Sequence, residues 1–204
     1  MSYWTLNTAA RGGAIFAGSQ ASVYLEGPGL TGSGGVSNGD LPAFRSNHAL
    51  GGSGGAVYVE CFRFQASGVI FAGNSASDQG GAMCVPNAVV GADGTLTGLV
   101  MTDCAFEGNT AKFGGAFTVA NVSIRFPEAF NLTAIRKGNL TIDTKTNLQY
   151  DLIADLYVPQ QGLFSGCRFI NNSASRGGAL FISANQDTEL AMATFDNCAF
   201  TYNH

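Results

Sequence analysis

The stretch Asn172-Ser173-Ala174-Ser175-Arg176-Gly177-Gly178-Ala179-Leu180-Phe181 decides the fold, because the chain repeats it. Residues 7–16 carry the same spacing of Asn, Gly-Gly and Ala, and so do residues 109–118. Two looser copies join Asn47 to Gly54-Gly55 and Asn74 to Gly80-Gly81, with two and one extra residues before the glycines. Five ordered copies are not expected by chance, and they indicate a repeat architecture.

An aromatic residue stands three positions before each repeated Asn, and the final aromatic, Phe200, precedes Asn203 in the same way. In three copies a cysteine stands two positions before the aromatic: Cys104, Cys167 and Cys198. Successive repeated Asn residues are 40, 27, 35, 63 and 31 positions apart. The repeat positions are Trp4, Asn7, Gly12, Gly13, Phe44, Asn47, Gly54, Gly55, Phe71, Asn74, Gly80, Gly81, Phe106, Asn109, Gly114, Gly115, Phe169, Asn172, Gly177, Gly178, Phe200 and Asn203.

Short runs of β-branched and aromatic residues, bounded by Gly, Asn, Asp and Pro, fill the space between the motifs. Such runs predict strands separated by turns. With a period near 30 residues they predict an all-β chain, a parallel β-helix of about five to seven coils. In such a coil the aromatic and cysteine form inward ladders, Asn bonds to backbone groups at a corner, and Gly-Gly permits a sharp turn.

The residues after each Gly-Gly-Ala alternate, which predicts which side chains face the core. We expect the apolar register to face inward: Ile15, Ala17, Val57, Val59, Met83, Val85, Phe117, Val119, Leu180 and Ile182. We expect the opposite register to face outward: Phe16, Tyr58, Cys84, Thr118 and Phe181. Within that outward register, Phe16, Tyr58 and Phe181 are candidates for an exposed aromatic contact stripe.

Composition narrows the possible partners. The 204 residues include 10 Lys and Arg against 14 Asp and Glu, a net charge of −4, and 46% are hydrophobic. The scattered basic residues do not predict a nucleic-acid partner, and no apolar run is long enough to predict a membrane span. We expect one β-helix over residues 1–204, with an excursion at 124–161 and a Gly/Ser-rich surface loop at 27–40. Because the chain starts and stops inside a repeat, we expect a segment of a longer protein.

The ordered recurrence of Phe-x-x-Asn and Gly-Gly-Ala-aliphatic, as in Phe106 to Asn109 and Gly114 to Phe117, resembles the repeat of the chlamydial polymorphic outer-membrane proteins. The resemblance covers nearly all of the chain outside residues 124–161. It implies a right-handed parallel β-helix, a solenoid like that of pectate lyases, on the cell surface or outside the cell, used as an adhesin or a stalk. The cysteines and the long excursion make the chain more similar to the eukaryotic and algal surface-protein examples.

The three cysteines of the repeat share one position, so we expect them to be close in space. They are candidates for a buried thiol ladder or for disulfides between coils, and both alternatives stay open. No metal site is expected, because no C-x-x-C motif or histidine partner accompanies them.

Little in the sequence points to catalysis. The only histidines, His48 and His204, have no Ser or Cys companion at motif spacing, and the nearest carboxylate pair, Asp151 and Asp155, lies within the expected excursion. The sequence therefore predicts a chain that is not an enzyme and that has no cofactor. Four N-x-S/T sequons are candidate glycosylation sites: Asn121, Asn131, Asn139 and Asn171.

Together these features favour a non-enzymatic extracellular or cell-surface β-helix that serves as a stalk, filament or surface-layer component, or as an adhesin. The expected partners are other protein chains, further repeats of the same protein, a cell-surface receptor or glycans. The alternative is a carbohydrate-binding or polysaccharide-processing β-helix, since fold alone does not decide activity.

Overall fold

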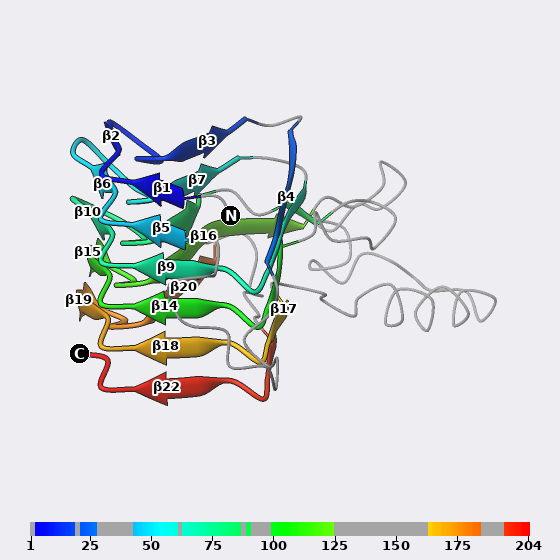
Figure 1. The fold of residues 1–204 in the computed structure, drawn as a ribbon. Coiled ribbons are helices and arrows are strands. Elements are labelled where there is room, and N and C mark those ends of the chain that lie inside the picture. The colour runs from blue at the N-terminus through cyan, green and yellow to red at the C-terminus, as the bar shows by residue number, and fades with distance from the viewer. Residues whose placement is uncertain are drawn as a thin grey trace, which may run out of the picture.

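The computed structural model describes residues 3–18, 21–27, 43–60, 63–86, 89–90, 99–124, 163–184 and 194–204. Within these ranges the regular structure consists of strands, with no helix. The strands stack along one axis, from the N-terminal end of the chain at one end to the C-terminal end at the other (Figure 1). The predicted loop at 27–40 and the predicted excursion at 124–161 lie outside the described residues, apart from Gly27 and Ile124.

Within the described residues the strands form four sheets, and every strand pair is parallel. Sheet 1 comprises β1 (Tyr3–Thr5), β5 (Ala43–Arg45), β9 (Ile70–Ala72), β14 (Ala105–Glu107), β18 (Arg168–Ile170) and β22 (Ala199–Thr201). Sheet 2 comprises β2 (Thr8–Ala9), β6 (His48–Ala49), β10 (Ser75–Ala76), β15 (Thr110–Phe113) and β19 (Ser173–Arg176).

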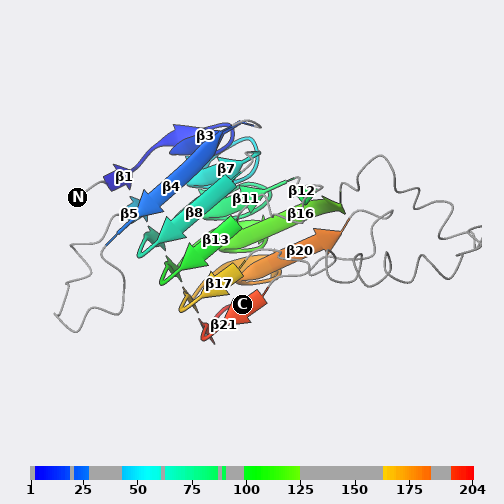
Figure 2. The same cartoon turned by 90° about the vertical axis from the view of Figure 1, so that its right-hand side faces the viewer.

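Sheet 3 comprises β3 (Ile15–Ala17), β7 (Val57–Val59), β11 (Met83–Val85), β16 (Phe117–Ile124), β12 (Val89–Val90) and β20 (Leu180–Ala184). Sheet 4, seen face on in Figure 2, comprises β4 (Ser22–Glu26), β8 (Arg63–Ser67), β13 (Leu99–Thr102), β17 (Leu163–Ser165) and β21 (Thr194–Asp196).

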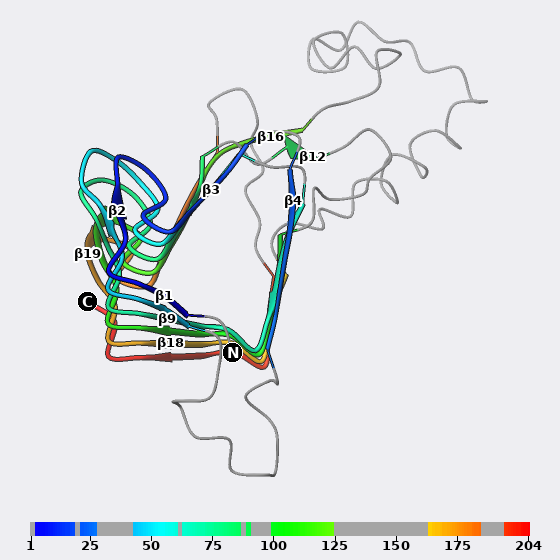
Figure 3. The ribbon, with the colours of Figure 1, turned by 45° about the horizontal axis from the view of Figure 1, so that its top comes forward.

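The chain visits sheets 1 to 4 in turn and then returns to sheet 1, one strand further along the axis. Figure 3 looks down this stack and shows successive passages superimposed around a closed outline. This all-β arrangement of parallel strands in stacked sheets is consistent with a β-solenoid. Across the 63-residue interval β14 pairs directly with β18 and Asn109 bonds to Asn172, so no described strand of sheet 1 lies between them.

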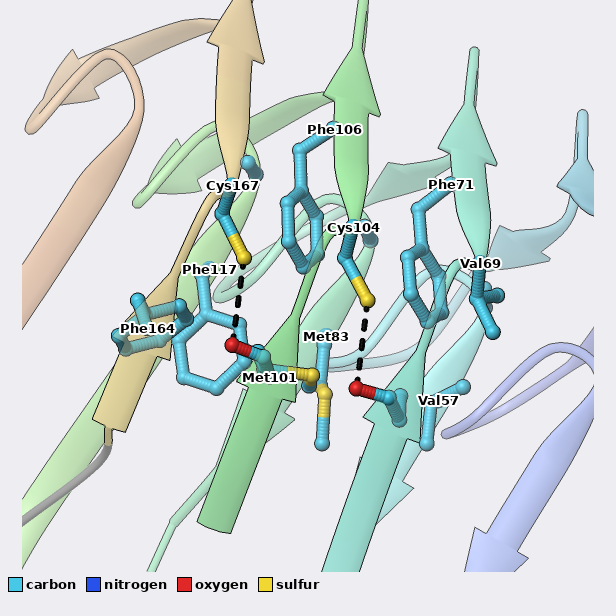
Figure 4. Close-up of a cluster of buried hydrophobic side chains, with 14 of the residues drawn as sticks. Val57, Val69, Phe71, Met83, Met101, Cys104, Phe106, Phe117, Phe164 and Cys167 are labelled. Carbon is cyan, nitrogen blue, oxygen red and sulfur yellow. Dashed lines mark hydrogen bonds between the residues drawn. The ribbon is translucent and has the colours of Figure 1, made fainter. Parts of the chain in front are cut away.

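The core lies inside the outline, where sheets 1, 3 and 4 contribute rows of apolar side chains (Figure 4). The aromatic rings of sheet 1 stack face to face from Trp4 to Phe200, with centroids 4.4 to 5.0 Å apart and interplanar angles of 8° or less. Phe117 of sheet 3 meets Phe106 and Phe164 edge-on. Each coil therefore buries its apolar side chains against the coils above and below it.

Both ends of sheet 1 turn through left-handed backbone conformations that the repeat analysis did not predict. The residue before each repeated Asn has a positive φ, and these residues are Leu6, Ser46, Gly73, Gly108, Asn171 and Tyr202. A second set precedes sheet 1: Gly68, Asp103, Gly166 and Asn197. Gly, Asn and Asp tolerate this conformation best, and these three types occupy seven of the ten positions.

Candidate functional site

The repeated asparagines form a continuous hydrogen-bond ladder at the corner between sheets 1 and 2. The backbone N–H and the Nδ2 of Asn74 both donate to Oδ1 of Asn109, each at 2.9 Å. Asn74 Nδ2 also donates to the carbonyl oxygen of Phe44 at 3.0 Å, in the preceding coil. The same pattern runs from Asn7 to Asn203, and the four inner asparagines are fully buried. Each side chain therefore satisfies a backbone N–H that lies outside the strands, and it also bonds a backbone carbonyl of the preceding coil.

The glycine pairs allow close axial stacking at the turn between sheets 2 and 3. Gly80 has a φ of +63°, which L side chains rarely adopt. A Cβ on Gly81 would meet the carbonyl oxygen of Gly115 and would lie 2.6 Å from the backbone nitrogen of Thr110. The first glycine of the pair therefore makes the turn, and the second leaves room for the next coil.

The repeat cysteines form a row of thiols beside the aromatic stack. Cys104, Cys167 and Cys198 are free, and the first two are fully buried. Their thiols donate to carbonyl oxygens of the preceding coil, those of Ala66, Met101 and Phe164 respectively, at 3.3 to 3.5 Å. Figure 4 shows the bonds of Cys104 and Cys167. The hydrogen bond with Cys104 raises the pKa of Cys167 most, and burial of the thiol raises it further.

The predicted outward aromatic stripe is wrong at Tyr58. Phe16 is 54% exposed and Phe181 is half-buried, but Tyr58 is only 6% exposed. The reason is that the turn before sheet 3 folds back over its outer face. The Arg11 guanidinium lies 5.3 Å from the Tyr58 ring centroid, and its Nη1 lies 3.5 Å from the Tyr58 hydroxyl.

The same covering layer buries two other residues that we expected to face solvent. Thr118 is fully buried, and its Oγ1 donates to the carbonyl oxygen of Phe113 at 3.0 Å. Cys84 is 1% exposed, and burial raises the pKa of its thiol to about 12. Phe113 also packs against Phe181, with centroids 5.3 Å apart. The outer face of sheet 3 is therefore covered at Tyr58, Cys84 and Thr118, while Phe16 stays exposed.

Of the candidate glycosylation sites, the structure describes the side-chain setting of Asn171 alone. Asn171 is exposed and has a φ of 54° in the tight corner before the ladder. Asn121 lies in β16, and Asn131 and Asn139 lie outside the described residues.

The part of the chain that the structure describes contains no group of three or more His, Cys, Asp or Glu placed to hold a metal ion. His48 Nδ1 lies 2.6 Å from Ser75 Oγ, and both residues belong to one row of sheet 2. The pair Asp151 and Asp155 lies outside the described residues. Among the described residues there is also no helix with the length and hydropathy to cross a membrane.

Comparison with known proteins finds no match: no family model, no curated protein and no solved structure resembles the chain closely enough to report.

Proposed function

We propose that this chain is a non-enzymatic structural segment of an extracellular or cell-surface protein, a rigid stalk or a component of a filament or surface layer. The observation that carries the proposal is the unbroken axial order: the asparagine ladder and the aromatic stack both run from the first described coil to the last. In an enzyme the catalytic side chains converge on one substrate. Here the repeated asparagines and aromatic rings are instead spread at regular intervals along the axis.

The finer architecture belongs to the same proposal. We infer a right-handed β-helix, because parallel β-crossover connections are right-handed in about 98% of cases. Its coils are β1–β4, β5–β8, β9–β13, β14–β17 and β18–β21, with β22 beginning another. The excursion at 124–161 then belongs to the coil that holds β16 and β17.

The surface location rests on the resemblance of the repeat to the chlamydial polymorphic outer-membrane protein repeat. We propose membership of that group on the ordered motifs such as Phe106 to Asn109 and Gly114-Gly115. Adhesion to a receptor or to glycans would use the outer faces, because the inner faces are filled by the core.

Electron microscopy of the native source material, labelled with an antibody against this chain, tests the proposal. Label that repeats at a fixed interval along a fibre or layer would support it, and scattered label on cell surfaces would support the adhesive form. Label found chiefly in the medium would contradict it.

In parallel, the purified chain is incubated with acidic and neutral polysaccharides. Cleavage that one Asp substitution abolishes would replace the structural function with an enzymatic one.

A further inference from the structure

Two columns of aligned residues run along the axis, and their exposed ends carry opposite charges at matching heights. The first lies on the outer face of sheet 4, where strand register aligns Glu26, Ser67, Thr102, Ser165 and Asp196. Only the first and last of these five are charged, and both are exposed acids. We call this row the acidic column.

The second column lies at the turns that lead from sheet 2 to sheet 3. Backbone hydrogen bonds and strand pairing align Arg11, Ser53, Gln79, Phe113 and Arg176. Again only the first and last residues are charged, and both are exposed arginines. We call this row the basic column. In both columns the charged ends are four strand steps apart, about 19 Å at the usual strand spacing of about 4.8 Å.

The columns lie on opposite sides of the coil. Figure 3 places β2 and its following turn on one side of the outline and β4 on the other, and Figure 1 agrees. Moving one copy sideways without rotation brings its acidic column against the basic column of its neighbour. In that arrangement Glu26 faces Arg11 and Asp196 faces Arg176, with uncharged side chains between them.

We propose that copies of this chain associate side by side in the same orientation through these two columns. This inference rests on the proposed structural function and names the partner as a second copy of the chain. The contact is heterologous, with a different surface from each copy, so it leaves both outer columns free and can extend into a sheet of parallel molecules.

Other charges near the basic column weaken it without cancelling it. Glu60 lies 3.8 Å from Arg11, but both side chains are partly exposed, and pairs of this kind contribute little. Lys112 and Asp78 lie in adjacent coils, where the Lys112 N–H donates to the Asp78 carbonyl oxygen, and their charges offset each other. Arg176 lies 5.7 Å from the Phe113 ring centroid and has no ion pair within the described residues.

The contact is narrow and polar, so we expect weak association that depends strongly on salt. Analytical ultracentrifugation of the purified full chain at ionic strengths of about 0.01 M and about 1 M measures it. We expect self-association at low salt that is lost at high salt. The variant Arg176→Glu should weaken it about tenfold, because a favourable pair becomes a repulsive one.

Arg168→Glu is the matched control. Arg168 is exposed, lies in β18 of the same coil and changes the net charge equally, but it lies on sheet 1 outside both columns. We expect wild-type association from this control. A monomeric wild type at low salt, or equal weakening by both substitutions, would overturn the lateral contact.

A charge exchange separates lost contact from lost folding. The double variants Glu26→Lys with Asp196→Lys, and Arg11→Glu with Arg176→Glu, should each fail to self-associate. Their mixture should associate, because each then offers the charge that the other needs. A monomeric mixture would refute the pairing of columns but would leave the structural function to be decided by the microscopy.

Discussion

Replacing Asn109 by Ala should be among the most destabilising polar substitutions in this protein. Asn109 is fully buried, and its Oδ1 accepts from the N–H and the Nδ2 of Asn74 at 2.9 Å each. Its Nδ2 donates to the carbonyl oxygen of Phe71 at 2.9 Å and to Oδ1 of Asn172 at 3.0 Å. Alanine removes all four bonds, although Asn172 Oδ1 keeps the bond from the backbone N–H of residue 109.

The magnitude follows from the groups left without partners. Two buried donors lose the partner that the Asn109 side chain supplies: the Asn74 N–H and one hydrogen of Asn74 Nδ2. Each such loss costs about 1–3 kcal/mol, which gives about 2–6 kcal/mol in total. We expect about 4 kcal/mol, because the vacated polar space can admit a water molecule.

Urea denaturation followed by far-ultraviolet circular dichroism measures the free energy of unfolding, and hydrogen exchange of the Asn74 amide gives a local measure. The matched control is Asn7→Ala, at the half-buried end of the ladder. That change removes one side-chain bond, from Asn7 Nδ2 to Asn47 Oδ1 at 2.8 Å, and should cost about 1 kcal/mol. An Asn109→Ala cost equal to or below the control cost would refute the ladder as a source of stability.

Three further predictions concern the turn, the core and the thiols. Gly81→Ala should prevent native folding, as judged by circular dichroism, because its Cβ meets backbone of the next coil; Gly18→Ala, with open space around it, should fold normally. Phe71 lies between two stacked rings, so Phe71→Ala should lower the free energy of unfolding by about 3–5 kcal/mol. Phe200 is 47% exposed, so the control Phe200→Ala should lower it by no more than half as much. Burial raises the pKa of Cys84 from 9.0 to about 12, so its contribution to stability is complete below pH 9 and falls by about 1.4 kcal/mol per pH unit as the pH rises toward 12. Cys84→Ala should reduce this slope in urea titrations at each pH, and an unchanged slope would contradict the assignment.

The repeat predicted the interior well because interior positions obey one rule in every coil. An Asn at the corner must bond to the Asn of the next coil, and a ring must stack on the next ring, so Asn74 and Phe71 keep their types and spacing along the chain. Parallel pairing in register then follows from the repeat itself. One consequence is that Asn109 and Asn172, 63 residues apart, lie close together, because the Asn side chains bond only between consecutive coils.

The outer layer was not predictable in the same way. Whether Tyr58 faces solvent depends on where the turn carrying Arg11 folds, and the alternation of residues along a strand holds no information about that turn. The left-handed corner residues had a weak signal in Gly73-Asn74 and Gly108-Asn109, but Leu6 and Tyr202 adopt the same φ without it. Both side chains are exposed, so the backbone geometry of the corner, and not side-chain packing, overrides local preference at these two positions.

Interior and surface positions of the coils are under different constraints, and this difference gives the two charged columns a functional meaning. The core demands an apolar side chain at each repeated inward position, and the corner demands Asn, so the interior positions are constrained in every coil. The outer columns are under no such demand, yet Glu26 and Asp196 stand at the same separation as Arg11 and Arg176. Charges that only kept the protein soluble would need no common height along the axis. Matched heights matter only when two axes lie side by side, and this is the arrangement that a layer of parallel molecules requires.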